Sequence, residues 1–239
     1  MLDDRNILLG VTGGIAAYKA VTLCSQLVKA GAVVDVILTD AARQFVAPLT
    51  FQALTHRPVV VEMFSLLAET EIGHVTLARR ADLLIIAPAT ANSIAKLAAG
   101  LADNMLTTTA LATEAPILLA PAMESHMWAN PLTQDNVTRL CQKRDVTLVG
   151  PGEGRLASGA RGVGRMAEPE TIVSKLEASF APGPLDGQQG WSVTIGEGGE
   201  ATVVSPGGSR STPGGYVIEL TNTGGEIELE KPVSDLMAE

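Results

Sequence analysis

Two adjacent glycines near the N-terminus, Gly13 and Gly14, are the first residues whose placement could serve a ligand. They follow an apolar run at residues 5–11 and precede a helical pattern of apolar residues at 17–28. Backbone N–H groups at such a junction can approach a phosphate at the helix N-terminus. The G-x-G-x-x-G and Walker lysine patterns are absent, so a single phosphate fits better than a pyrophosphate. A tight turn needed only for packing explains the pair equally well.

A second polar group follows the apolar run 83–87 and Pro88. Residues 90–93 read Thr-Ala-Asn-Ser, at the expected start of a helix over 91–99. Helix capping alone explains Thr90. Asn92 is harder to explain, because asparagine weakens a helix interior.

The three histidines could act as bases or ligands. A lone histidine is more often structural, and His56, His74 and His126 lack zinc-ligand spacing, so no metal site is expected. Of the three, only His74 becomes a candidate functional residue, and only when it is considered together with other segments.

Two further segments carry reactive or polarizable side chains. Met123 and Met127 lie four residues apart and would share a face if that segment is helical, although methionine at this spacing is more often core. Glu124, between them, is the unusual residue. Residues 150–168 form a Gly-rich stretch without periodicity, which predicts a long loop that is a lid, a binding loop or disordered.

The elements that must position these residues alternate between strand and helix patterns. We expect strands at 5–11, 33–38, 83–87, 116–120 and 146–149, with helices between them and a last helix at 169–180. This alternation predicts a doubly wound, flavodoxin- or Rossmann-like parallel sheet in a three-layer α/β/α arrangement. Ligands of such sheets bind beyond the carboxyl ends of the strands. We expect Gly31 and Gly100 to end helices, and we expect Thr39, Asp40 and Asp103 to offer helix caps.

Composition narrows the class of protein. Hydrophobic residues make up 46% of the 239 and aromatic residues 3%, which predicts a core of Ala, Val, Leu and Ile, as in a covered parallel sheet. A net charge of -9 argues against a nucleic-acid partner. Cys24 and Cys141 sit in apolar helical patterns, so we expect free thiols and a cytoplasmic location. The charged N-terminus and the lack of a run of ~20 apolar residues predict neither a signal peptide nor a membrane span.

The character of the chain changes after Pro182. We expect one domain at 1–181 and an extension at 182–239, rich in Gly and Ser, with short strands at 191–195, 201–204 and 216–220 or a mobile tail. We find no function there.

Taken together, six segments resemble the flavin-containing cysteine decarboxylases. These enzymes act on phosphopantothenoylcysteine or on the C-terminal cysteine of lantibiotic precursor peptides. The similarity runs in register over residues 5–176. The matching segments are Gly-Gly-Ile-Ala-Ala-Tyr-Lys at 13–19, Gly-His at 73–74, Ala-Pro-Ala-Thr-Ala-Asn at 87–92, Leu-Ala-Asp-Asn at 101–104, Pro-Ala-Met…Met-Trp at 121–128 and Gly-Arg-Met-Ala-Glu-Pro at 164–169.

The resemblance implies bound FMN, with its phosphate near the glycine pair. Cofactor-binding positions implied in this way are Gly13, Gly14, Ile15, Thr39, Thr90, Ala91, Asn92, Ser93 and Ala122. Substrate-binding positions are Met123, Glu124, Met127, Arg155 and Ala157. His74 matches the family's catalytic base. Family members assemble as trimers or as dodecamers of trimers with flavin between subunits, so we expect His74 to reach a neighbour's FMN.

The implied chemistry needs an electron sink, because carbon dioxide cannot leave a cysteine carboxylate without one. Oxidation of the thiol side chain to a thioaldehyde provides it, and the cofactor carries out that step. An imidazole suits proton transfer near neutral pH.

Two positions depart from the family. The family has an asparagine where this chain has Glu124, and an ionised Glu124 would repel a carboxylate unless it is turned away. The family has a proton-donating cysteine where this chain has Ser158, and a hydroxyl is a far weaker acid than a thiol with its pKa near ~8.5.

These departures leave three alternatives. The favoured one is a working decarboxylase of phosphopantothenoylcysteine. The second is an oxidative decarboxylase that releases an enethiol, and the third is an FMN-binding protein without this catalysis. A flavin prenyltransferase is a weaker fourth, against which the motif at 123–128 speaks. The stretch after Pro182 is too short for the synthetase domain often fused to bacterial decarboxylases, so we expect a stand-alone or truncated decarboxylase.

Overall fold

The computed structural model describes residues 2–63, 73–180, 192–195, 201–205 and 208–212. The chain divides into two compact units, Met1–Phe180 and Ala181–Glu239. Each unit is described by itself below.

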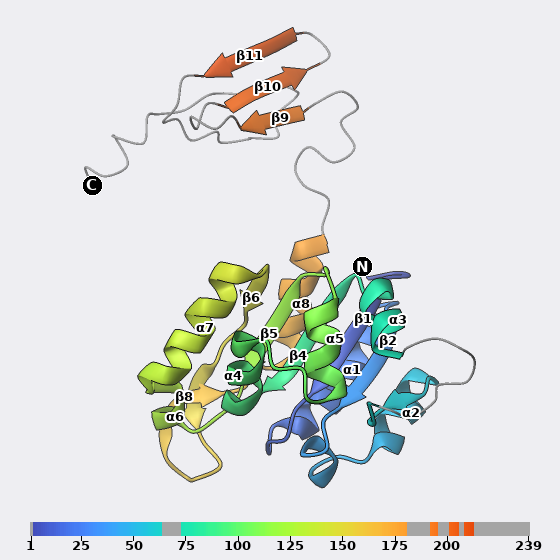
Figure 1. The fold of residues 1–239 in the computed structure, drawn as a ribbon, viewed down its shortest axis with the longest axis vertical. Coiled ribbons are helices and arrows are strands. Elements are labelled where there is room, and N and C mark those ends of the chain that lie inside the picture. The colour runs from blue at the N-terminus through green and yellow to red at the C-terminus, as the bar shows by residue number, and fades with distance from the viewer. Residues whose placement is uncertain (1, 64–72, 181–191, 196–200, 206–207, 213–239) are drawn as a thin grey trace. The chain divides into compact units, whose positions relative to one another are not determined.

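The first unit is built on a six-stranded parallel sheet in the order β3-β2-β1-β4-β5-β6 (Figure 1). Its strands are β1 (Asn6–Val11), β2 (Val33–Leu38), β3 (Val59–Val60), β4 (Leu83–Ala89), β5 (Ile117–Pro121) and β6 (Val146–Leu148). The chain runs outward from β1 to β3 and then crosses to β4, so the order reverses between β1 and β4. That reversal is the switch point at which doubly wound sheets bind ligands.

Helices cover both faces of the sheet. They are α1 (Ala17–Lys29), α2 (Pro48–Thr55), α3 (Gly73–Arg80), α4 (Ala91–Ala99), α5 (Met105–Ala112), α6 (Ser125–Ala129), α7 (Pro131–Lys143) and α8 (Pro169–Phe180), with a short 3-10 helix at Ala42–Gln44. One core cluster joins the sheet to α1, α2 and α8, and a second joins it to α3, α4, α5 and α7. The predicted three-layer α/β/α fold is confirmed.

The central strands β4 and β5 are apolar throughout because both of their faces are buried. In β1, Leu9 packs into the first cluster and its neighbour Leu8 into the second, as the two-residue period of a strand requires. Burying each such leucine contributes about 1.5–3 kcal/mol. The continuous apolar runs in the sequence are therefore the signature of a covered parallel sheet.

Helix ends follow local rules, with one correction. Gly100 ends α4 with a φ of 68°, in the left-handed region that glycine adopts without strain. Asn104, and not Asp103 as predicted, caps α5: its side chain accepts the N–H of Thr107, whose hydroxyl lies within hydrogen-bond distance of the Asn104 N–H. Asp103 lies one residue too early to reach that N–H and bonds Lys96 instead.

The segment 150–168, predicted as a loop, contains an antiparallel ribbon of β7 (Gly152–Arg155) and β8 (Arg161–Arg165). The prediction missed it because glycines and charged residues give neither strand an apolar alternation. A second correction concerns α7, in which Cys141 and Leu132 are exposed although they repeat at helical spacing.

The second unit contains an antiparallel sheet of β9 (Ser192–Ile195), β10 (Ala201–Ser205) and β11 (Gly208–Thr212) in the order β11-β10-β9. Two of these strands match the runs predicted at 191–195 and 201–204. The third predicted run, 216–220, lies outside the described residues. In the parts of both units that are described, no helix is long and apolar enough to cross a bilayer.

Candidate cofactor and substrate cavity

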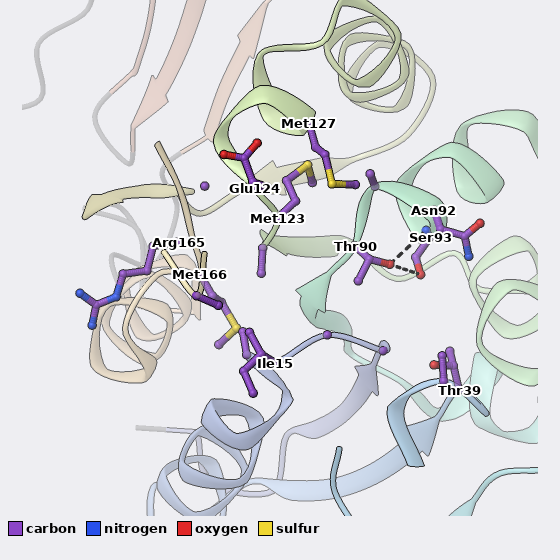
Figure 2. A pocket seen from close by; sticks show the side chains of 18 of the residues that line it. Ile15, Thr39, Thr90, Asn92, Ser93, Met123, Glu124, Met127, Arg165 and Met166 are labelled. Atoms are coloured by element: carbon purple, nitrogen blue, oxygen red, sulfur yellow. Dashed lines mark hydrogen bonds between the residues drawn. The ribbon is translucent and has the colours of Figure 1, made fainter. Parts of the chain in front are cut away.

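A cavity of about 1110 Å³ opens at the carboxyl ends of the central strands. Every site position predicted above except His74 lines it. Figure 2 shows side chains from the loops after β1, β2, β4 and β5 and from the end of β8 around this one space. The volume exceeds the upper end of the range of roughly 300–1,000 Å³ typical of ligand pockets, which leaves room for a cofactor and a substrate together.

The glycine pair after β1 serves two different purposes. A Cβ on Gly13 would lie 2.3 Å from the Ala41 Cβ, so this glycine is required for packing. A Cβ on Gly14 would meet only the Thr90 methyl, at 3.6 Å. Packing within the protein therefore requires glycine at position 13 but not at position 14.

The turn after Gly13 presents free donors to the cavity. Among the described residues, the backbone N–H groups of Gly14, Ile15 and Ala16 meet no protein acceptor. They stand at the N-terminus of α1, where the helix dipole favours negative charge. This is the geometry that binds a phosphate.

Thr12, which sequence reasoning missed, joins the ends of β1 and β4. Its buried hydroxyl donates to the Pro88 carbonyl at 2.7 Å and accepts the Thr90 N–H at 3.1 Å. These contacts place Thr90 opposite the glycine turn. Thr12 and Thr90 are 78 residues apart, so only the fold reveals the pair.

Thr90 caps α4 as predicted, accepting the Ser93 N–H at 3.4 Å and lying 3.1 Å from the Ser93 hydroxyl. Ser93 is buried, whereas Asn92 is exposed toward the cavity. Within the described part of the chain, the Asn92 amide has no partner. The residue that propensity could not explain is thus free to bind a ligand.

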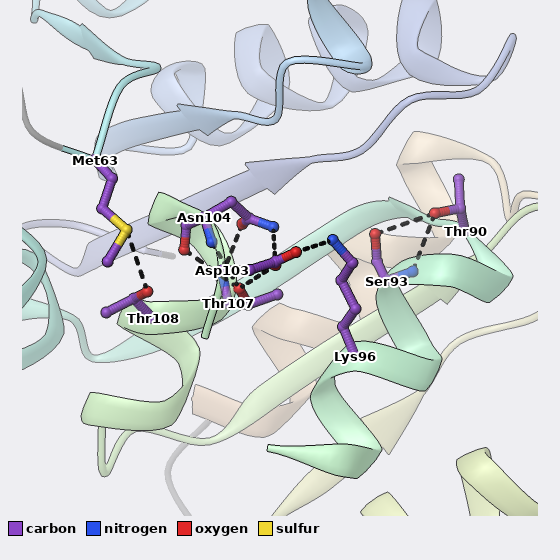
Figure 3. A network of polar contacts seen from close by, with 8 residues as sticks. All are labelled: Met63, Thr90, Ser93, Lys96, Asp103, Asn104, Thr107 and Thr108. Atoms are coloured by element: carbon purple, nitrogen blue, oxygen red, sulfur yellow. Dashed lines mark hydrogen bonds and ion pairs between the residues drawn. The ribbon is translucent and has the colours of Figure 1, made fainter. Parts of the chain in front are cut away.

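A polar network that sequence reasoning also missed borders this side of the cavity (Figure 3). Lys96 donates to Asp103 at 2.5 Å, and Asp103 also accepts from the Asn104 side chain at 3.0 Å. The bond from Lys96 holds the pKa of the Asp103 carboxyl below its ordinary value. Asp103 therefore stays ionised at neutral pH, and its contact with Lys96 ties α4 to the segment that precedes α5.

The loop after β2 contributes Thr39 and Asp40. The Thr39 hydroxyl accepts the Ala42 N–H at 3.3 Å. The N-cap of the short 3-10 helix is Ala41, without a side-chain capping bond, so the predicted caps at Thr39 and Asp40 are wrong. The Thr39 side chain lies on the cavity wall next to the glycine turn (Figure 2).

Beyond β5, Ala122, Met123, Glu124 and Met127 line the cavity. Glu124 is the N-cap of α6, so Met123 lies outside the helix and the shared helical face does not form. The Glu124 carboxylate accepts the Ser125 hydroxyl at 2.7 Å and the His126 N–H at 2.6 Å. These bonds hold the pKa of the Glu124 carboxyl below its ordinary value, so Glu124 is an anion at neutral pH.

The β7–β8 ribbon closes one side of the cavity. Arg155 and the loop residues Leu156, Ala157 and Ser158 line it. The ribbon is anchored by the bond from the Met123 N–H to the Gly164 carbonyl, at 2.9 Å.

Close packing and charge also fix the base of this ribbon. A Cβ on Gly164 would lie 2.3 Å from the Met123 carbonyl oxygen. Lys19, buried in α1, bonds Glu168 at 3.0 Å, and Arg165 bonds the same carboxylate at 2.7 Å. The ribbon is therefore held in place from two sides.

His74 does not line the cavity of its own chain. It lies half-buried in the first turn of α3. Its catalytic role stays a prediction.

Among the described residues no group of three or more His, Cys, Asp or Glu is placed to hold a metal ion. Neither cysteine lies at the cavity: Cys24 is buried and Cys141 is exposed on α7. Burial raises the pKa of the Cys24 thiol to about 12.

A cavity at the switch point of a doubly wound sheet, with free N–H donors at a helix N-terminus, defines a phosphate-anchored cofactor-binding α/β protein. The chain belongs to the Flavoprotein family, whose model matches residues 1–181.

Curated relatives carry the name Coenzyme A biosynthesis bifunctional protein CoaBC. The one from Bacillus subtilis (strain 168) is 50% identical over 191 residues, 79% of this chain and 47% of the relative. The one from Escherichia coli (strain K12) is 44% identical over 181 residues, 76% of this chain and 44% of the relative. The chain thus spans about half the length of these relatives.

Solved structures share the fold. A PPC decarboxylase mutant complexed with pantothenoylaminoethenethiol is 34% identical with a TM-score of 0.67, over 74% of this chain and 98% of that one. The FMN binding protein AtHal3 is 32% identical with a TM-score of 0.64, over 74% and 97% of the two chains.

Proposed function

We propose that residues 1–181 form an FMN-binding domain that decarboxylates 4'-phosphopantothenoylcysteine to 4'-phosphopantetheine in coenzyme A biosynthesis. The observation that carries the proposal is the single cavity in which the implied cofactor and substrate positions meet. The names of the relatives, coenzyme A biosynthesis proteins and a PPC decarboxylase, support the same reaction.

The residues present fit a cofactor with one phosphate. The space beside Gly14, which a Cβ would partly fill, lets a phosphate approach the N–H groups of Gly14, Ile15 and Ala16. The free Asn92 amide also lines the cavity, as a donor and acceptor for further polar groups. When bound, FMN supplies the oxidation and reduction that allow carbon dioxide to leave.

The chain's own side chains shape the rest of the site. Met123, Met127 and Met166 give the cavity thioether walls, which pack well against aromatic rings and sulfur groups. Leu156 and Ala157 add an apolar wall from the ribbon loop that helps to exclude water. The two carboxylate oxygens of Glu124 accept hydrogen bonds from the Ser125 hydroxyl and the His126 N–H, so this carboxylate caps its own helix.

We also propose that the active assembly is a homo-oligomer, a trimer or a dodecamer of trimers, in which His74 serves a neighbouring subunit's cavity as the base. The position of His74 outside its own cavity supports this arrangement. Two free cysteines suit a reducing compartment and support a cytoplasmic location.

Subunit mixing tests this sharing. His74→Asn should bind FMN normally and lose carbon dioxide release, and Gly14→Ala should bind FMN weakly. His74→Asn keeps an intact FMN site, and Gly14→Ala keeps the histidine base. Mixed oligomers that combine the two should therefore recover part of the activity. Mixtures no more active than the separate variants would contradict a shared site, and full turnover by His74→Asn would place the base elsewhere.

A second candidate function is oxidative decarboxylation with release of an enethiol. Ser158 favours it, because a hydroxyl lines the cavity where a thiol donor is expected and, within the described residues, no cysteine does. In this reaction the substrate loses carbon dioxide and two hydrogens. The two electrons then leave to an external acceptor such as dioxygen.

Product mass separates the two functions. Incubation with 4'-phosphopantothenoylcysteine should remove carbon dioxide alone if the full decarboxylase is correct. Removal of carbon dioxide plus two hydrogens, with consumption of dioxygen, would establish the oxidative reaction. Ser158→Cys should then shift the product toward 4'-phosphopantetheine. An unchanged substrate would contradict both functions.

A further inference from the structure

An ion pair on the cavity wall, Lys96 with Asp103, has no part in the function proposed above. The Lys96 ammonium donates to the Asp103 carboxylate at 2.5 Å, and both residues line the cavity. Among the described residues, Asp103 is the only acceptor that this ammonium meets. An ammonium has three N–H donors, so Lys96 keeps two of them for water or a ligand.

The start of α5 fixes the position of this ammonium. The second Asp103 oxygen accepts from the Asn104 amide at 3.0 Å and lies 3.5 Å from the Thr107 hydroxyl. Lys96 reaches the held carboxylate from α4, on the side of the helix that also carries Ser93 (Figure 3). The Lys96 side chain is 23% exposed. Because water and salt screen a partly buried charge less than an exposed one, this ammonium can act strongly on a group inside the cavity.

The wall that carries this pair differs in polarity from another part of the cavity. It runs along α4 to the start of α5 and includes the polar side chains of Thr90, Asn92, Ser93, Lys96, Asp103 and Asn104. Elsewhere Ile15, Met123 and Met166 supply aliphatic and thioether groups. Figure 2 shows these three apolar side chains on the side of the cavity away from Asn92 and Ser93. A ligand with one polar and one apolar edge fits this division.

The ring system of FMN has two such edges. Carbonyl oxygens and ring nitrogens make its pyrimidine edge polar, and two methyl groups make its other edge apolar. The free N–H groups of Gly14, Ile15 and Ala16 suit the phosphate end of the cofactor. With the phosphate at that turn, the wall that contains Lys96 and Asn92 suits the pyrimidine edge.

We propose that the Lys96 ammonium, held by Asp103, donates a hydrogen bond to the pyrimidine edge of FMN and raises the reduction potential of the bound cofactor. The inference rests on the proposed function, since it concerns the cofactor of that site. A lysine suits this task because its ammonium can donate to the Asp103 carboxylate and to the ring at the same time.

Reduction of FMN should strengthen this hydrogen bond. On oxidation to a thioaldehyde, the substrate thiol group loses two electrons and two protons. FMN takes both electrons and one proton, the base takes the other proton, and the ring gains one negative charge. A cationic donor binds the charged ring more tightly than the neutral one. Because the reduction potential depends on the ratio of these two affinities, Lys96 makes bound FMN a stronger oxidant of a thiol.

The test compares Lys96→Met, Lys96→Arg and the control Lys175→Met with the unaltered protein. Lys175 is exposed on α8 and does not line the cavity. Dissociation constants for oxidised FMN and for oxidised riboflavin, which lacks the phosphate, are measured by quenching of flavin fluorescence. The reduction potential of bound FMN is measured without substrate, by anaerobic titration with dithionite beside a reference dye.

Lys96→Met should weaken the binding of reduced FMN about tenfold more than that of oxidised FMN, which lowers the two-electron potential by about 30 mV. Lys96→Arg should keep most of the potential, because a guanidinium keeps the charge and the donors. Lys175→Met should match the unaltered protein. Oxidised FMN and oxidised riboflavin should lose affinity by the same factor, because they share the ring. If Lys96→Met does not fold, Lys96→Gln, which is neutral but can still bond Asp103, should show the same fall in potential.

An unchanged potential in Lys96→Met would overturn the inference. A loss of affinity for FMN with riboflavin unaffected would also overturn it, because Lys96 would then contact the phosphate. Turnover of 4'-phosphopantothenoylcysteine by the unaltered protein, with an unchanged potential in Lys96→Met, refutes this inference and leaves the proposed function standing. A lowered potential in Lys96→Met, with no decarboxylation by the unaltered protein, supports the role of Lys96 and refutes the proposed reaction.

Discussion

Alanine substitution at the two glycines after β1, Gly13 and Gly14, should have opposite effects on stability and on FMN binding. Each is replaced by alanine, one at a time. Gly13→Ala should destabilise the fold without acting on the cofactor directly. Gly14→Ala should leave the fold intact and weaken FMN. The sequence alone could not choose between a phosphate site and a packing turn, and the structure gives one role to each glycine.

The magnitude for Gly13 follows from the atoms that its Cβ would meet. The Ala41 Cβ would lie 2.3 Å away and the Ala41 carbonyl carbon 2.7 Å away. Carbon atoms pack best at roughly 3.5–4.0 Å, so backbone has to move by about 1 Å. Overpacking of this kind costs about 1–3 kcal/mol. At roughly 2–4 °C per kcal/mol, Tm should fall by several degrees.

For Gly14 the nearest atom is the Thr90 methyl, at 3.6 Å, an ordinary contact. Stability should therefore stay level or rise by about 0.4–1 kcal/mol, because alanine restricts the unfolded chain. The added methyl instead occupies the approach to the free N–H groups. We expect the Kd for FMN to rise about tenfold or more, which corresponds to ~1.4 kcal/mol.

The assay uses urea unfolding of the cofactor-free proteins together with titration by FMN. We expect Gly13→Ala to lose stability and Gly14→Ala to lose affinity for FMN. Gly14→Ala with an unaltered Kd would refute the phosphate site at this turn. A fully stable Gly13→Ala would refute the packing argument.

Further predictions concern the buried hydroxyl and the thiols. Thr12→Val should lower the free energy of unfolding by about 1–3 kcal/mol and weaken FMN binding, because it leaves the Thr90 N–H without its acceptor. The control Thr22→Val, on the exposed face of α1, should change neither stability nor FMN binding. Equal effects of the two substitutions would contradict the role of Thr12. Burial raises the Cys24 pKa to about 12, so below that pH the thiol stays neutral and unreactive. An Ellman titration at pH 8 should detect one thiol in the native protein and none in native Cys141→Ser. Unfolding the unaltered protein should expose the second thiol. A reactive Cys24 in the folded protein would contradict its burial.

The sheet was predictable because burial leaves a direct trace in the sequence. Strands covered on both faces, such as β4 and β5, are continuous apolar runs. The two residues of β3 are too few to carry such a pattern. The β7–β8 ribbon was missed because backbone contact with Met123, and not apolar side chains, holds it.

The candidate site was predictable to the extent that its residues fall in short matching segments at strand ends. Those segments contain most of the predicted cavity positions, and the others are Thr39, Ser93, Arg155, Ala157 and Ser158. Contacts between distant segments were not predictable, as the Thr12–Thr90 pair shows. Lys19 could have been found, because its spacing puts a lysine on the same buried helical face as Leu23 and Leu27.

FMN titration of the cofactor-free protein is the most direct test of a cofactor cavity at the carboxyl ends of β1 and β4. We expect saturable binding of one FMN per chain, with quenched flavin fluorescence and a perturbed visible spectrum, and weaker binding in Gly14→Ala. Flavin fluorescence that stays at the free value through the titration, with no spectral change, would contradict a cofactor cavity at the carboxyl ends of β1 and β4.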